Sequence, residues 1–135
     1  MKHRRLTIAA GIVVAVAAVG GVRNLSAQVP GFKRVELQRH DLALPEREVV
    51  MARGEFAAGA GVPRHTHPGE EIAYVLEGEV TVEVEGKAPV TMKAGDSFFV
   101  PGKTVHTAKN AGKTPAKVLS TYIVEKGKPL ATMVK

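Results

Sequence analysis

The chain contains no cysteine and no tryptophan, and aromatic residues make up only 4% of its 135 residues. The absence of cysteine excludes a disulfide-stabilised fold and any metal site that needs thiolate ligands. The low aromatic content argues against a large pocket that stacks a planar substrate. No cluster of lysine and arginine with interleaved aromatics occurs, so the sequence lacks the usual signature of a nucleic-acid-binding surface. The length allows a single domain.

The positive charge is concentrated at one end of the chain. The formal net charge is +6 and the sequence pI is about 9.8, values that on their own would suggest a polyanionic partner. Four of the basic residues lie within residues 1–27, which contain no acidic residue. The remaining 108 residues therefore carry a net charge of only +2. We expect no nucleic-acid partner for this near-neutral part.

Residues 1–27 have the layout of an export signal. Basic residues at positions 2–5 precede 17 uncharged residues, 6–22, and the segment Leu25–Ala27 offers a cleavage site. Arg4 and Arg5 suggest the twin-arginine route. The alternative is an uncleaved N-terminal anchor helix, because about 17 apolar residues is the lower limit of a membrane span.

The N-terminal segment therefore predicts a location for the protein. A cleaved signal gives a periplasmic or secreted protein. An uncleaved one gives a protein anchored in the inner membrane and facing the periplasm. In both cases only this segment is expected to contact a membrane.

Residues 28–135 show the pattern of short strands and turns, with no helical periodicity of useful length. The clearest strand is 79–85, where valines at 80, 82 and 84 alternate with polar residues, so one face is buried. Glycine and proline turn signals recur about every 8 to 10 residues, which indicates an all-β sandwich or barrel. The further predicted strands are 33–38, 47–56, 72–76, 90–93, 97–100, 105–109 and 116–124.

Two histidines lie one residue apart, at His65 and His67. In a strand, residues i and i+2 point to the same face, so two imidazoles would converge as a metal site requires. Glu71 follows four residues later, and Pro68-Gly69 can turn the chain so that its carboxylate approaches the same point. His40 has no comparable neighbours and is expected on the surface.

The segment around these histidines resembles the first sequence motif of the cupin superfamily, G-x5-H-x-H-x3-E-x6-G. The chain meets every fixed position of this motif, with Gly59, His65, His67, Glu71 and Gly78. The spacing to Gly78 selects Glu71 rather than Glu70 as the motif acid.

A second segment is similar to the other cupin motif, G-x5-P-x-G-x2-H-x3-N. Gly95, Pro101, His106 and Asn110 match its fixed positions. Lys103 stands where the motif has glycine, which leaves the shape of this turn open but not the placement of His106. We expect Asn110 to close the turn after the strand that carries His106.

The resemblance implies that residues 28–135 form a cupin-like jelly-roll, a double-stranded β-helix barrel, preceded by the signal or anchor helix of residues 1–27. It implies that one divalent transition metal is bound by His65, His67, Glu71 and His106. Three imidazoles and one carboxylate suit Fe or Mn, which we favour, and also Ni, Cu or Zn, rather than Ca or Mg. Such a set leaves positions open for substrate, as catalytic sites do.

Three function classes follow from this reading. The favoured one is an exported metal-dependent dioxygenase, a quercetin-dioxygenase-like cupin acting on a small molecule. The second is a non-oxidative metalloenzyme, an isomerase or decarboxylase. The third is a non-catalytic envelope protein that binds a metal or small ligand.

A homodimer is expected because cupin barrels often pair through their sheets. Tyr122 is assigned to the core by its strand spacing, and Tyr74 to packing rather than catalysis.

Overall fold

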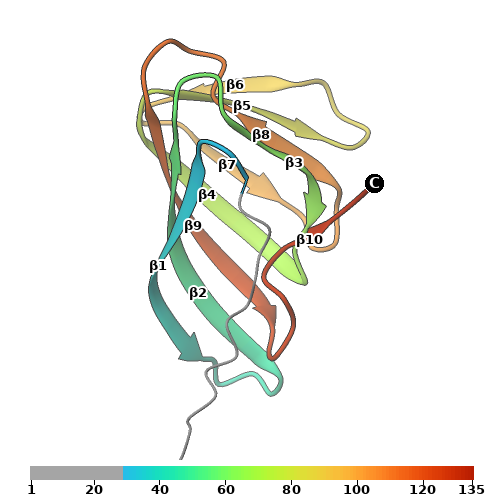
Figure 1. The fold of residues 1–135 in the computed structure, drawn as a ribbon. Helices are drawn as coiled ribbons and strands as arrows, with labels where there is room; N and C mark the ends of the chain where they lie inside the picture. Colours follow the sequence, from blue (N-terminus) through green and yellow to red (C-terminus); the bar gives the residue numbers. More distant parts are fainter. Residues whose placement is uncertain (1–28) are drawn as a thin grey trace, which may run out of the picture.

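The computed structural model describes residues 29–135, which form ten strands in two antiparallel five-stranded sheets (Figure 1). The first sheet has the order β1-β2-β9-β4-β7 and the second β10-β3-β8-β5-β6. The strands are β1 (Phe32–Asp41), β2 (Arg47–Phe56), β3 (Gly61–Thr66), β4 (Gly69–Glu77), β5 (Glu79–Val84), β6 (Val90–Lys93), β7 (Ser97–Val100), β8 (His106–Lys109), β9 (Ala116–Glu125) and β10 (Thr132–Met133).

The two sheets face each other as in a jelly-roll, which confirms the predicted all-β fold class. In Figure 1 the long strands β1, β2 and β9 extend beyond the shorter sheet at one end. The chain after β9 loops back across this end to reach β10, which pairs with β3. The helix expected in residues 1–27 lies outside the described residues, so the boundary at residue 27 remains a prediction. Within residues 29–135, no helix has the length and apolar character needed to cross a membrane.

The inner faces of the two sheets form the core. Along β9 the residues alternate between buried and half-buried, as period-two patterning requires. On β5, Val80 and Val82 are buried, which confirms the predicted alternation. The core has two parts, one around Val75 and Val118 and another around Val50 and Val124.

The expectation that Tyr74 contributes to packing is wrong. On β4, Glu71, Ala73 and Val75 point inward, so strand alternation directs Tyr74 to solvent together with Ile72 and Leu76. These three side chains lie on the outer face of the first sheet. Phe99 of β7 is the direct cross-strand partner of Ile72 and is also exposed.

Candidate metal centre

The four predicted metal ligands come from both sheets and meet between them. His65 of β3 and His106 of β8 are direct cross-strand partners in the second sheet. His67 follows the end of β3, in the short connection to β4. Glu71 lies on β4 of the first sheet and points toward the histidines from the opposite side. The fold thus brings together all four residues that the sequence motifs selected.

The site is buried and tightly clustered. Each of the three histidines is 3% exposed, and Glu71 is 6% exposed. One ring nitrogen from each histidine can be chosen so that all three atoms lie within 4.8 Å of one another. Glu71 Oε2 lies 3.2 Å from His67 Nε2 and 3.4 Å from His106 Nε2. The three histidines form a group that could hold a metal ion, with the carboxylate beside it.

Backbone carbonyls fix the protonation of all three imidazoles. His65 Nδ1 lies 2.7 Å from the Pro63 carbonyl, His67 Nδ1 2.5 Å from that of Leu130, and His106 Nδ1 2.9 Å from that of Thr104. A carbonyl oxygen only accepts hydrogen bonds, so each Nδ1 carries the hydrogen and donates. In the neutral ring each Nε2 therefore presents a lone pair, the form that binds a metal.

These lone pairs create an unfavourable contact unless a cation is present. His67 Nε2 and His106 Nε2 are buried and have no hydrogen-bond partner among residues 29–135. Both atoms nevertheless face the Glu71 carboxylate at close range. Buried polar groups are normally paired, so acceptors facing one another need a proton or metal ion between them. The donor set therefore fits a bound divalent transition metal.

Burial and mutual proximity shift the pKa values of two ligands in the direction that favours metal binding. Burial, with His106 nearby, lowers the pKa of His65 to about 4, so its ring stays neutral at pH 7. Burial alone would raise the pKa of Glu71. The His106 and His67 side chains beside it outweigh that effect and hold the Glu71 pKa well below its usual range. At neutral pH His65 is therefore a neutral imidazole beside the ionised Glu71 carboxylate.

A cavity of about 30 Å³ lies against the site, and two residues that line it, Arg34 and Ser120, were not singled out from the sequence. Ser120 and Tyr122 of β9 line it, and the Tyr122 ring packs edge-on against His67 with centroids 4.7 Å apart. Arg34 of β1 lines it as well. The assignment of Tyr122 to the core is confirmed, and its buried ring also lines this cavity, whereas Arg34 belongs to no sequence motif. A larger surface groove on the other side of Phe32 contains none of the ligands.

The departure from the second motif at Lys103 is explained by its backbone. Lys103 has a φ of 61°, in the left-handed region where glycine is favoured. Lys103 thus adopts the backbone conformation that the motif glycine favours, and its N–H donates to the His67 carbonyl at 3.0 Å. Its ammonium group pairs with Glu125 at 2.9 Å, at the surface. Gly78 of the first motif also has a positive φ, 72°.

Comparisons with known proteins agree with this architecture. The family model described as "Cupin domain" matches residues 52–122, just over half of the chain. "Germin-like protein subfamily 2 member 2" of Arabidopsis thaliana is 44% identical over 79 residues, covering 55% of this chain and 36% of the relative. The chain thus spans just over one third of the length of this curated relative.

Two solved structures illustrate the likeness of the fold. "Recombinant oxalate oxidase in complex with glycolate" superposes with a TM-score of 0.64 at 27% identity, covering 79% of this chain and 57% of the other. The DMSP lyase DddQ from Ruegeria pomeroyi superposes with a TM-score of 0.59 at 26% identity, covering 64% and 43% of the two chains. With the family model matched over both motif regions and the jelly-roll in place, this chain belongs to the cupin family.

Proposed function

We propose that this protein is a mononuclear metal-dependent enzyme that oxidises a small molecule with O₂, as a dioxygenase. The observation that carries the proposal is the set of three carbonyl-fixed imidazoles whose buried Nε2 atoms converge beside the Glu71 carboxylate. A closed structural site would use all its ligand positions, whereas a four-ligand set with an adjacent cavity has room for a substrate.

Each residue has a defined part in this proposal. His65, His67, Glu71 and His106 hold the metal, and their carbonyl partners keep the rings oriented. A bound Fe or Mn ion would supply Lewis acidity and redox capacity. The buried walls around the cavity exclude bulk water from the substrate. The likeness in fold to an oxalate oxidase supports an oxidative reaction.

The ligand assignment is tested by His106→Ala. We expect the wild-type protein, purified from its own source, to carry about one equivalent of Fe or Mn. The variant should lose at least tenfold in metal affinity, because it removes an imidazole that binds the metal directly. Loss of a group that only hydrogen-bonds to a metal ligand already costs about 10–100-fold in affinity. His40→Ala, at an exposed histidine, is the matched control and should bind metal normally. Undiminished metal binding by His106→Ala would refute the ligand set.

Oxygen uptake then decides between the two enzymatic classes. The metal-loaded protein is assayed in an oxygen electrode with a panel of phenolic, enolic and carboxylic substrates. Substrate-dependent consumption of O₂ supports the dioxygenase proposal. Turnover without O₂ consumption favours a lyase, isomerase or decarboxylase, the second candidate, which the likeness to a DMSP lyase supports. A metal-indifferent protein without turnover would instead be a non-catalytic binding module.

Export and self-association belong to the same proposal. The first 27 residues favour delivery to the periplasm or beyond, and cleavage at Ala27 is checked by mass spectrometry of the mature protein.

The homodimer expected for a cupin stays a prediction. The exposed apolar side chains of Ile72, Tyr74 and Phe99 give it a candidate contact face.

A further inference from the structure

We propose that Arg34 is a substrate-recognition residue and that the site takes a small molecule bearing a carboxylate, which the Arg34 guanidinium binds. The inference rests on the proposed function to the extent that the rest of this molecule lies against the metal. It adds the chemical class of the substrate and a residue that no motif contains.

The position of Arg34 follows from the register of β1 and β2. Arg34 pairs with Gly54, and Gly54 in turn pairs with Val118 of β9, whose side chain is in the core. Arg34 therefore lies on the inner face of the first sheet. Gly54 has no side chain, and the Phe32 and Phe56 rings occupy the space beside it, each 3.2 Å from the position that a Cβ would take.

The guanidinium is directed into the cavity of the metal centre. Arg34 lines this cavity together with His65, Glu71 and His106. Its guanidinium carbon lies 5.8 Å from the centre of the Tyr122 ring and 5.7 Å from that of Phe32. Contacts of this kind orient the planar group while leaving its N–H donors free.

Arg34 has no acidic partner among residues 29–135, in contrast to three other arginines. Arg53 and Arg64 each contact a carboxylate, and Arg39 contacts two. No carboxylate oxygen of the described residues lies within 4.0 Å of the Arg34 guanidinium. A half-buried arginine without a partner is a ready site for a carboxylate, which it can bind through two parallel hydrogen bonds.

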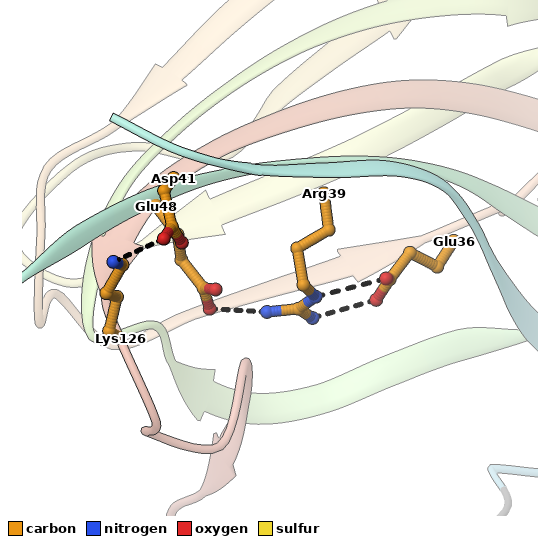
Figure 2. A network of polar contacts seen from close by, with 5 residues as sticks. All are labelled: Glu36, Arg39, Asp41, Glu48 and Lys126. Atoms are coloured by element: carbon orange, nitrogen blue, oxygen red, sulfur yellow. Dashed lines mark hydrogen bonds and ion pairs between the residues drawn. The ribbon is translucent and has the colours of Figure 1, made fainter. Parts of the chain in front are cut away.

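The acid nearest to Arg34 along β1 is engaged elsewhere. Glu36, two residues further on, accepts hydrogen bonds from Arg39 Nε at 3.1 Å and Nη2 at 2.8 Å (Figure 2). Figure 2 also shows Arg39 contacting Glu48 with its remaining nitrogen. This arrangement holds the Glu36 carboxylate on Arg39 and leaves the Arg34 guanidinium available to a ligand.

Charge and size together select a small anion. A divalent metal ion and the Glu71 carboxylate would together carry one net positive charge. The Arg34 guanidinium adds a second positive charge at the same cavity. The cavity is small, about 30 Å³, so a bulky molecule would not fit beside the ligands. Both features favour a short carboxylate over a neutral or bulky substrate.

The test measures glycolate binding by calorimetry to protein loaded with Zn²⁺, which is redox-inactive and prevents turnover. Glycolamide, of the same size but neutral, is titrated in parallel. We expect Arg34→Gln to weaken glycolate binding roughly 10- to 100-fold, as the loss of a charge-assisted hydrogen-bonded pair predicts, and to leave glycolamide binding little changed. Arg34→Lys should be intermediate, since it keeps the charge without the planar fork.

The control variant is Lys33→Gln, which removes one positive charge from the adjacent, exposed position of β1. It should bind glycolate like the wild type, and all variants should retain Zn²⁺ and similar melting temperatures. Equal glycolate affinity of wild type and Arg34→Gln would overturn the role of Arg34, as would failure of the Zn²⁺-loaded wild type to bind glycolate. If the wild type takes up no metal, the proposed function fails first, and Arg34-dependent binding of glycolate to the metal-free protein still supports the inference.

Discussion

Asn110 is fully buried, and its side chain satisfies three backbone groups at once. Its Nδ2 donates to the carbonyls of Ala57 at 3.2 Å and Thr114 at 2.7 Å, and its Oδ1 accepts from Gly112 N–H at 2.9 Å. The side chain therefore closes the turn after β8, as its place in the second motif predicts, and also ties that turn to the β2–β3 connection.

Asn110→Ala should destabilise the protein by about 2–4 kcal/mol, because it leaves buried backbone groups without partners. Urea unfolding followed by circular dichroism measures the change. Thr81→Ala, which removes an exposed hydroxyl pair with Thr91, is the comparison and should cost less than about 1 kcal/mol. Similar midpoints for the two variants would show that the Asn110 hydrogen bonds do not contribute as described.

At the residue scale, the candidate ligands could be predicted from the sequence because the two motifs fix the number of residues between them. His65, His67 and Glu71 lie within seven residues, so local strand geometry and one turn are enough to place them. Arg34 could not be found this way. Its approach to the site depends on pairing with Gly54 across a long hairpin, and a lone arginine in a strand is ordinarily a surface residue.

At the scale of the strands, a polar network fastens β1 to β2 and to the end of β9. Arg39 links Glu36 with Glu48, and Lys126 pairs with Asp41 at 2.7 Å (Figure 2). Glu48 is buried on the inner face of β2, whereas its partner Arg39 is exposed. A buried carboxylate that loses its cationic partner is costly, so this ion pair differs from the ordinary surface pairs of the molecule.

Arg39→Leu should therefore lower the free energy of unfolding by about 1–3 kcal/mol, because Glu48 is left buried without a partner. The double variant Arg39→Leu/Glu48→Leu should recover most of the loss, since no unpaired charge remains. Arg64→Leu, whose partner Glu85 is exposed, should change stability by less than about 1 kcal/mol. Chemical denaturation of the four proteins provides the measurement. A double variant less stable than Arg39→Leu would contradict this account.

Most strand bounds were predicted closely, but β1 and β4 extend beyond the predicted ranges 33–38 and 72–76, and two strands were missed. The predicted bounds of β2, β6 and β7 coincide with the observed ones, and β9 differs by one residue. The strand β3 was not predicted as a separate element, because Pro63 and Arg64 are exposed and a register shift after Val62 interrupts its pairing with β8. With only two residues, β10 is too short to leave a pattern.

For the molecule as a whole, the ligands couple stability to pH. The pKa of His65 is about 4 in the folded state and about 6.5 when unfolded. The unfolded state therefore binds more protons between these values, and stability is full above pH 6.5 and falls as the pH drops toward 4. Below about pH 4.5 the lowered pKa of Glu71 adds a loss of the same sign.

Metal-free protein should lose roughly 3 kcal/mol of stability between pH 6.5 and 4 through His65. Urea midpoints measured across this range, with a chelator present, test the expectation. His65→Gln should flatten the dependence, while His40→Gln, at an exposed position, should keep it. An unchanged slope in His65→Gln would assign the pH dependence to other groups.

The overall architecture was predictable from the recurrence of turns and from the two motifs, but the pairing of the sheets was not. The contacts that bring Glu71 opposite His106, and β10 beside β3, join residues far apart in the chain. Such contacts depend on how the whole sheet folds back on itself, and no local periodicity encodes them.

The hydrogen bond between His67 Nδ1 and the Leu130 carbonyl spans 63 residues and sets the order in which the site can be completed. While the chain is being synthesised, His65, His67, Glu71 and His106 have all emerged before Leu130 does. Until then the His67 ring lacks the acceptor that selects its tautomer, and the shorter sheet lacks β10. The arrangement of the four candidate ligands is therefore complete only after the β9–β10 loop has been synthesised, although both motifs have emerged earlier.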